Sequence, residues 1–186
     1  MFKEIDVKPY CFMQPVIMIA TYNEDGTSNV MNAAWGNSID YDKFAICIAA
    51  NHKTWENIIR EKACSVAFAT KEYVKEADYF GIVSGNQVQS KVASANMTSV
   101  ECSSVHAPMI KEFKMALECQ LLSYDQESEI MIFEIKKVVV EDSILTDGKI
   151  DVTKLQPICY DSGMHRYFAI GEVVGSAFKD GKKLIK

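Results

Sequence analysis

The hydrophobic pattern of the first 50 residues predicts three strands in quick succession. Residues 16–22 are apolar without alternation and end at residues 23–26, which contain an Asp-Gly step. An apolar run of this length before such a step is typical of a buried strand entering a tight hairpin. We therefore expect an antiparallel return strand over residues 27–39 and a third strand over residues 44–50.

The period of the pattern then changes to that of a helix. Trp55, Ile58, Ile59 and Lys62 recur at spacings of three and four, with polar residues between them. This spacing places one apolar stripe on a short amphipathic helix. Residues 64–70 return to a mostly apolar run, which predicts a further strand.

A second helix and a long connection are expected next. Residues 71–80 combine charged positions with a weak apolar face, and we expect Gly81 and Gly85 to end this helix. Residues 83–110 contain no long periodic run and are rich in Ser, Asn and Gln. They predict a connection with one helical turn at residues 90–95.

The clearest alternation of apolar and polar positions lies in residues 114–121, which predicts a half-buried strand. A hairpin loop over residues 124–128 and a long partner strand over residues 129–141 follow. Several antiparallel strands with few helices predict a mainly β fold, either a barrel or a sandwich. Because no repeat or linker interrupts residues 1–186, we expect a single domain.

Composition and charge narrow the function classes. The net charge of -5 provides no basic field for a nucleic-acid backbone, so we expect no nucleic-acid partner. The N-terminus lacks an apolar signal core and no apolar run approaches the roughly 20 residues that span a bilayer, so we expect no membrane association. The six cysteines form no CxxC pair, which favours free thiols, no metal site and a reducing cytoplasm.

Several familiar catalytic and nucleotide-binding motifs are absent from the sequence. No GxGxxG follows a strand, and no Walker loop, GxSxG elbow or HExxH helix occurs. A Rossmann domain, a P-loop nucleotidase, a serine hydrolase and a zinc peptidase therefore have no support from local motifs.

Residues 51–54, Asn-His-Lys-Thr, lie between the third strand and the first helix. Unpaired backbone N–H groups at a helix N-terminus favour an anion, and Lys53, Thr54 and His52 add side-chain donors. These residues therefore suit a phosphate. The alternative interpretation is that Asn51 or Thr54 only caps the helix and Lys53 is a solvated surface charge.

Residues 29–38 form a second segment of interest. Ala33, Ala34 and Gly36 are small and flank Trp35, so a flat ring could reach the backbone and accept hydrogen bonds from main-chain N–H groups. The alternative is a barrel strand whose small residues fit where neighbours crowd in. Together, the two segments suggest a planar phosphorylated ligand.

The order of these segments resembles the flavin reductase-like family, in particular its flavoredoxin-type branch. The resemblance covers residues 10–181 and rests on an ordered set of short matches. These are Pro15-Val16, residues 23–26, Asn29-Val30-Met31 with Trp35, residues 51–54, Ser90-Lys91, Ala107-Pro108, residues 117–119 and residues 167–175.

The resemblance implies a fold, an assembly and a cofactor. The fold would be the FMN-binding split β-barrel, a six-stranded antiparallel, Greek-key-like barrel with flanking helices, assembled as a homodimer with FMN near the interface. Lys91 would contact the phosphate or the ribityl chain, although Val92 stands where relatives often have an aromatic residue. The main chain of Met31, Asn32, Ala33, Ala34 and Trp35 would contact the flavin ring, and Asn51, His52, Lys53 and Thr54 would hold the phosphate.

Three functions are compatible with this resemblance. In the first, an FMN-dependent oxidoreductase passes electrons from NAD(P)H or another reductant to a second flavin, a metal or a redox protein. In the second, the protein is a flavoredoxin-like electron carrier without a pyridine nucleotide site. In the third, it binds flavin without turnover. A flavin needs no catalytic acid or base from the protein, and His165 is the one weak candidate for such a role.

Overall fold

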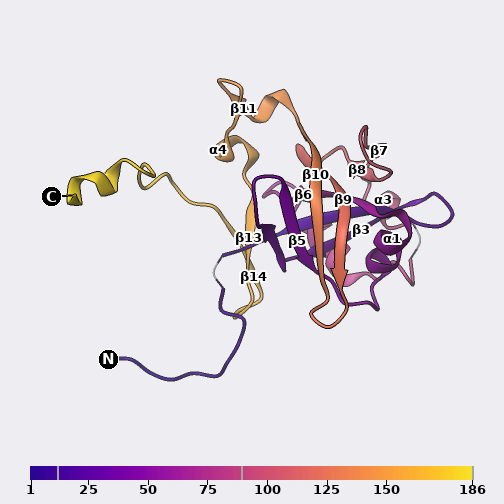
Figure 1. Ribbon diagram of the computed structural model, residues 1–186, viewed down its shortest axis with the longest axis horizontal. Helices are drawn as coiled ribbons and strands as arrows, with labels where there is room; N and C mark the ends of the chain where they lie inside the picture. Colours follow the sequence, from indigo (N-terminus) through magenta and orange to yellow (C-terminus); the bar gives the residue numbers. More distant parts are fainter. Residues whose placement is uncertain (12, 89, 186) are drawn as a thin grey trace.

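A seven-stranded antiparallel sheet forms the body of the protein in the computed structural model, which describes residues 1–11, 13–88 and 90–185 (Figure 1). Each strand in the spatial order pairs with the next in antiparallel register. That order is β3 (Ser28–Ala33), β2 (Ile17–Tyr22), β6 (Ala63–Phe68), β9 (Met115–Asp125), β10 (Ile130–Val140), β5 (Lys43–Cys47) and β4 (Gly36–Ser38).

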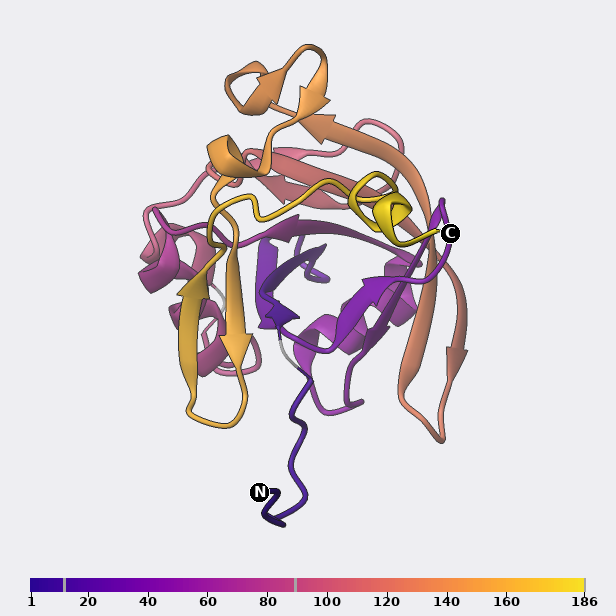
Figure 2. The ribbon, with the colours of Figure 1, turned by 90° about the vertical axis from the view of Figure 1, so that its left-hand side faces the viewer.

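The sheet is curled, because its two edge strands are neighbours in the sequence. Only Ala34 and Trp35 separate β3 from β4, yet these strands lie at opposite edges of the sheet. The single strand expected over residues 27–39 is therefore wrong, since the chain bends there and changes its pairing partner. Counted as one bent strand, β3 and β4 leave six strands around the curl (Figure 2). The expected mainly β barrel-like architecture is confirmed.

The apolar run of β2 is buried on both of its faces. Ile17 and Ile19 point into the interior of the curl, where they pack with Phe44 and Phe133. Met18 belongs to a second cluster, which the helices cover from outside. Burial on both faces explains why residues 16–22 show no alternation.

In the described part of the chain, four α-helices and two 3₁₀ turns accompany the sheet. The helices expected in the first half of the chain are confirmed. Gly81 does not end its helix, because it lies inside the last turn and packs against the Asn32 side chain. The elements are α1 (Lys53–Glu61), α2 (Val74–Ile82), α3 (Lys91–Ser94), α4 (Val152–Leu155), η1 (Asp142–Ile144) and η2 (Asp180–Leu184).

Among the residues that the structure describes, three smaller sheets lie outside the body, and the hydrophobic pattern does not predict them. One of them falls inside residues 83–110, which the sequence predicts as a connection. A three-stranded sheet stands beside the open side of the curl (Figure 2). The strands are β1 (Gln14–Pro15) with β13 (Ile158–Asp161) and β14 (Arg166–Ala169), β7 (Ser99–Glu101) with β8 (Pro108–Ile110), and β11 (Leu145–Thr146) with β12 (Lys149–Ile150).

The β9–β10 hairpin is confirmed, but β9 is not half-buried along its first half. Ala116 and Glu118 are buried as completely as the apolar residues between them. The Glu118 carboxylate accepts hydrogen bonds from the backbone N–H and hydroxyl groups of Ser103 and Ser104. A loop therefore covers the face that the sequence pattern assigns to solvent.

Both ends of the chain leave the body on the same side, next to β13 and β14 (Figure 1). Residues 1–11 and 171–185 are exposed throughout. Within the part of the chain that the structure describes, no helix is long and apolar enough to cross a membrane.

Candidate functional site

A cavity of about 790 Å³ opens between β3, the N-terminus of α1, α2 and the β13–β14 hairpin. This volume lies within the range of small-molecule and cofactor sites. The cavity brings together all the residues that the sequence analysis assigned to cofactor binding, and His165 as well. These are Met31, Asn32, Ala33, Ala34, Trp35, Asn51, His52, Lys53, Thr54 and Lys91.

One end of the cavity is the N-terminus of α1. His52 is the N-cap residue, and its side chain does not bond to a backbone N–H of the helix. The Thr54 hydroxyl instead accepts a hydrogen bond of 2.9 Å from the Asn29 carboxamide. Neither Asn51 nor Thr54 is therefore the side-chain cap of the alternative interpretation. The first N–H groups of α1 have no intrahelical acceptor, so this end favours an anion.

Lys53 is the basic side chain at this end. Its side chain is 20% exposed, and its ammonium group lies 2.9 Å from the Glu56 carboxylate, one helical turn along α1. Lys53 is therefore neither buried nor freely solvated. A dianionic phosphate at the helix end would add a second, stronger counter-charge for this ammonium group.

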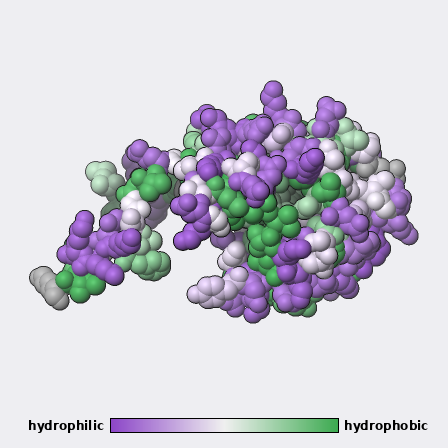
Figure 3. Space-filling view, turned by 90° about the horizontal axis from the view of Figure 1, so that it is seen from above, coloured by the Kyte–Doolittle hydropathy of each residue, from purple (hydrophilic) through white to green (hydrophobic). Residues whose placement is uncertain are grey.

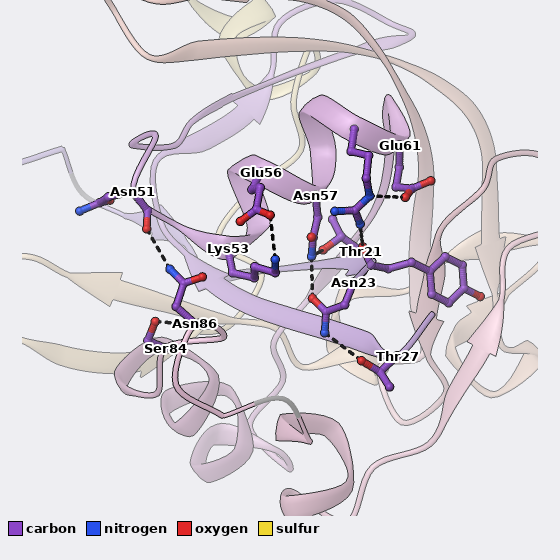
Figure 4. A network of polar contacts seen from close by, with 12 residues as sticks. Thr21, Asn23, Thr27, Asn51, Lys53, Glu56, Asn57, Glu61, Ser84 and Asn86 are labelled. Atoms are coloured by element: carbon purple, nitrogen blue, oxygen red, sulfur yellow. Dashed lines mark hydrogen bonds and ion pairs between the residues drawn. The ribbon is translucent and has the colours of Figure 1, made fainter. Parts of the chain in front are cut away.

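The loop after α2 holds the segment before α1 in place (Figure 4). The Asn86 carboxamide donates a hydrogen bond of 3.2 Å to the Asn51 carbonyl. Gly85 packs so closely against the Asn29 side chain that a Cβ atom there would overlap the Asn29 carboxamide oxygen. Ser84 and Gly85 both line the cavity, and the sequence analysis missed both as site residues.

The bend between β3 and β4 forms the middle of the cavity. Met31 and Ala34 are half-buried, and the Trp35 side chain is 52% exposed. Gly36 is small because neighbouring residues crowd it, since a Cβ atom there would lie 2.7 Å from Ile17 Cδ1. Crowding thus explains Gly36, whereas residues 31–35 border the open space.

Lys91 points into the wall of the cavity. Its side chain is buried, and its ammonium group donates hydrogen bonds of 2.8 Å to the Val30 carbonyl and 3.2 Å to the Phe80 carbonyl. Burial lowers the pKa of Lys91 to about 8. The group still carries its charge at pH 7, so it contributes positive potential to the wall. Its contact with phosphate or ribityl stays a prediction.

The other end of the cavity is lined by Asp78, Tyr160 and Tyr167. None of the three was predicted as a site residue from the sequence. The Tyr167 hydroxyl donates a hydrogen bond of 2.9 Å to Asp78 Oδ1. Burial and, after it, the hydrogen bond to Asp78 raise the pKa of Tyr167 to about 12. The Tyr160 hydroxyl lies 2.7 Å from His165 Nδ1. No motif marks Asp78 or Tyr160, because they come from a helix and a distant hairpin.

Among the described residues, no group of three His, Cys, Asp or Glu side chains could hold a metal ion. The polar groups of the cavity are amides, hydroxyls, ammonium groups, imidazoles and main-chain groups, together with the carboxylates of Asp78 and Glu129. Such a set can hold a phosphate and a planar heterocycle by hydrogen bonds.

Comparison with known proteins agrees with this geometry. Residues 10–167 match the sequence model of the flavin reductase like domain. Flavoredoxin of Desulfovibrio vulgaris is 31% identical, with a TM-score of 0.93, and the match covers 97% of this chain and 100% of that one. Flavoredoxin from Methanosarcina acetivorans is 27% identical, with a TM-score of 0.89, and covers 99% and 100%.

A curated relative extends the likeness along the chain. An uncharacterized protein of Bacillus subtilis is 24% identical over 201 residues, which cover 96% of this chain and 94% of that one. The domain match accounts for more than half of the present sequence, and the flavoredoxins match it from end to end. The chain therefore belongs to the flavin reductase-like family, in its flavoredoxin-type branch.

Proposed function

We propose that this protein binds FMN in the cavity and acts as an oxidoreductase of the flavin reductase or flavoredoxin type. The observation that carries the proposal is that an uncapped helix N-terminus and the β3–β4 bend line one cavity. The first suits a phosphate and the second suits a flat ring. The family of the chain supports the same cofactor.

The residues present fit FMN. Asn51, His52, Lys53 and Thr54 would hold the phosphate, with Ser84 and Gly85 beside them. Residues 31–35 would position the ring. Gly81 has no side chain to fill the space beside Asn32, since a Cβ atom there would lie 3.4 Å from Asn32 Cβ. When bound, FMN supplies the electron and hydride chemistry. The protein binds and orients the cofactor and excludes water from one side of its ring.

Two modes of action follow from the family. A reductase would take electrons from NAD(P)H or another reductant and pass them to a small molecule or a redox protein. An electron carrier would keep its FMN tightly bound and exchange electrons only with other proteins. Because two flavoredoxins resemble this chain, the electron carrier is the alternative function. A flavin-binding protein without turnover is the third possibility.

A visible absorption spectrum of the purified protein, before and after saturation with FMN, tests the proposal. We expect flavin bands at about 375 and 450 nm. Under anaerobic conditions, bleaching by NADH or NADPH indicates the reductase, and bleaching only by dithionite indicates the carrier. A colourless protein that does not take up added FMN would contradict the flavin assignment.

The proposed assembly is a homodimer, with the cavity near the interface. Residues 170–185 form an exposed arm with apolar side chains that lack cover in the single chain (Figure 3). A second copy of the chain would cover them. The six cysteines are free, which suits a reducing compartment such as the cytoplasm. The apolar residues of the arm are Ile170, Val173, Val174, Phe178, Leu184 and Ile185.

A further inference from the structure

The Asn29 carboxamide connects three elements at the α1 end of the cavity. It lies on β3, bonds to Thr54 in the first turn of α1 and packs against Gly85 in the loop after α2. Asn29 and Thr54 both border the cavity, yet each is only 2% exposed. Polar side chains are buried at a high cost unless they are hydrogen-bonded, so the bond between these two residues is a fixed part of the structure.

The contact with Gly85 determines which way round the carboxamide lies. A Cβ atom on Gly85 would lie 2.3 Å from Asn29 Oδ1 and 3.1 Å from Lys53 Cβ, so the loop backbone fits between these two side chains. The carboxamide oxygen of Asn29 therefore faces the loop. Its NH₂ group faces α1 and donates the 2.9 Å hydrogen bond to Thr54 Oγ1.

This hydrogen bond decides how the Thr54 hydroxyl can act. A hydroxyl group has one proton and two lone pairs. One lone pair of Thr54 accepts the bond from Asn29, so the hydroxyl proton points elsewhere. Within residues 1–11, 13–88 and 90–185, no acceptor takes that proton. Because Thr54 borders the cavity, its hydroxyl remains a donor for a ligand.

A phosphate is the group that such a donor suits best. The oxygens of a phosphate dianion only accept hydrogen bonds, and bonds to a charged acceptor are the strong ones. A hydroxyl that rotates freely can also turn a lone pair toward the phosphate, which is unfavourable. The bond from Asn29 removes this orientation before the ligand arrives, and preorganisation of this kind raises affinity.

We infer that Asn29 is a positioning residue for the phosphate of the ligand. It fixes the Thr54 hydroxyl as a donor and so increases the preference of the site for a phosphorylated flavin over the same flavin without a phosphate. Asn29 acts through Thr54 and needs no contact of its own with the ligand. The inference rests on the proposed FMN site.

The experiment compares FMN with riboflavin, which has the same ring and ribityl chain but no phosphate. Fluorescence quenching gives the dissociation constant of each flavin, and the ratio of the riboflavin value to the FMN value measures what the phosphate contributes. A variant that only lowers the folded fraction weakens both flavins equally and leaves the ratio unchanged. The ratio therefore separates a positioning role from a merely structural one.

Three variants locate the effect. Thr54→Val has nearly the same shape without the hydroxyl, and we expect its ratio to fall by about tenfold to a hundredfold, the effect of one hydrogen bond to a charged group. In Asn29→Leu the hydroxyl is present but no longer fixed, so we expect a smaller fall of about threefold to tenfold. The double variant should match Thr54→Val alone, because both changes act on the same proton.

Asn57→Leu is the matched control. Asn57 is a buried carboxamide one turn further along α1, and it lies outside the set of residues that line the cavity. It bonds α1 to the β2–β3 hairpin by donating to Thr21 Oγ1 at 3.1 Å and to Asn23 Oδ1 at 2.9 Å (Figure 4). Its substitution loosens the same helix without freeing the Thr54 hydroxyl, so the ratio should stay at the wild-type value.

Several results would overturn the inference. They are equal affinity of the wild type for the two flavins, an unchanged ratio in Thr54→Val or Asn29→Leu, or a double variant whose ratio falls well below that of Thr54→Val. An equal fall in Asn57→Leu would also overturn it, because any loosening of α1 would then have the same effect.

Where Asn29→Leu does not fold, Asn29→Ser takes its place, since a serine side chain is too short to reach Thr54. The wild-type comparison needs no variant. Failure of the wild type to bind either flavin would instead overturn the proposed function itself.

Discussion

Lys53 combines two roles at the end of the cavity where the phosphate is proposed to bind. It extends the field of the α1 N-terminus and forms a surface ion pair with Glu56 one turn away. Surface ion pairs of this kind contribute little to stability, so removal of Lys53 should affect the ligand more than the fold.

We therefore expect Lys53→Ala to weaken FMN binding by about 1–3 kcal/mol, the contribution of a charge-assisted hydrogen bond. Fluorescence quenching of FMN measures this change. Lys43→Ala is the matched control, because Lys43 forms an ion pair of the same i, i+3 type with Asp40 away from the cavity. Unchanged FMN affinity in Lys53→Ala would remove Lys53 from the site.

A double substitution of Lys53 and Thr54 would be a less selective test of the phosphate end than Lys53→Ala. The Thr54 hydroxyl is buried and accepts the Asn29 hydrogen bond, so its loss would disturb β3 as well as the phosphate end. A lost affinity in that variant would have two causes. The single Lys53 substitution separates them.

Lys91 links the cavity wall to pH. Burial lowers the pKa of Lys91 from 10.5 to about 8 in the folded protein. Between these two values the unfolded chain binds more protons than the folded one, so the free energy of unfolding rises with pH. Below pH 8 both states are protonated, and the cost of burying the charge is fully present.

We expect the free energy of unfolding of wild type, relative to Lys91→Met, to rise by up to about 3 kcal/mol between pH 8 and 10.5. Subtraction of the two urea titrations cancels the ionisation of tyrosines and cysteines that both proteins share. Lys43→Met, at an exposed position, should give a flat difference. A flat difference for Lys91→Met would mean that Lys91 keeps its ordinary pKa.

At the scale of elements, β9 depends on a polar contact that anchors a loop. Burial raises the pKa of Glu118, but hydrogen bonds from Ser104 and Ser103 outweigh burial and lower it overall. A carboxylate with a lowered pKa stabilises the fold above its unfolded pKa and loses this effect as pH falls through the folded value. Glu118 therefore holds residues 102–104 against β9 at neutral pH.

Glu118→Gln should reduce the free energy of unfolding at pH 7 by about 2–3 kcal/mol, because one buried acceptor is replaced by a donor. The difference from wild type should shrink at acidic pH, below the ordinary pKa of a glutamate, as Glu118 itself becomes protonated. Urea unfolding at both pH values measures it. Glu134→Gln, at an exposed ion pair on β10, is the control and should change little. An equal loss in both variants would refute the special role of Glu118.

Local pattern predicted the elements whose burial is decided within one segment. The stripe of α1, the apolar run of β2 and the β9–β10 hairpin are of this kind. Gly81 and Glu118 could not be placed from local pattern, because their surroundings come from residues far along the chain. The chain bend at Trp35 could not be predicted for the same reason. After the bend, β4 pairs with β5 at the opposite edge of the sheet from β3, and no local pattern marks this change of partner.

The candidate site divides along the same line. The phosphate end could be predicted because the start of α1 is recognisable in the sequence. The role of residues 31–35 could be predicted from the small side chains in that segment. Asp78 and Tyr160 join the cavity only because α2 and the β13–β14 hairpin meet there. Single-sequence reasoning has no signal for such a meeting of distant elements.

At the scale of the whole molecule, the exposed arm of residues 170–185 is the feature that a single chain does not explain. Full burial of an apolar side chain such as Val174 or Phe178 contributes about 1.5–3 kcal/mol, and the isolated chain forgoes this contribution. The arm leaves the body beside β13 and β14, which border the cavity (Figure 2). In a twofold dimer each chain contributes one arm, so every contact between an arm and the other chain occurs twice.

The double variant Val174→Ser, Phe178→Ser should therefore raise the dimer dissociation constant by at least about tenfold, measured by analytical ultracentrifugation. Lys179→Ser, Lys182→Ser is the matched control, because it changes the same arm at polar positions and should leave the dimer intact. If the partner's arm shapes the cavity, FMN affinity should fall together with dimer content on dilution. A wild-type monomer saturated with FMN at every concentration would contradict both the dimer and its part in the site.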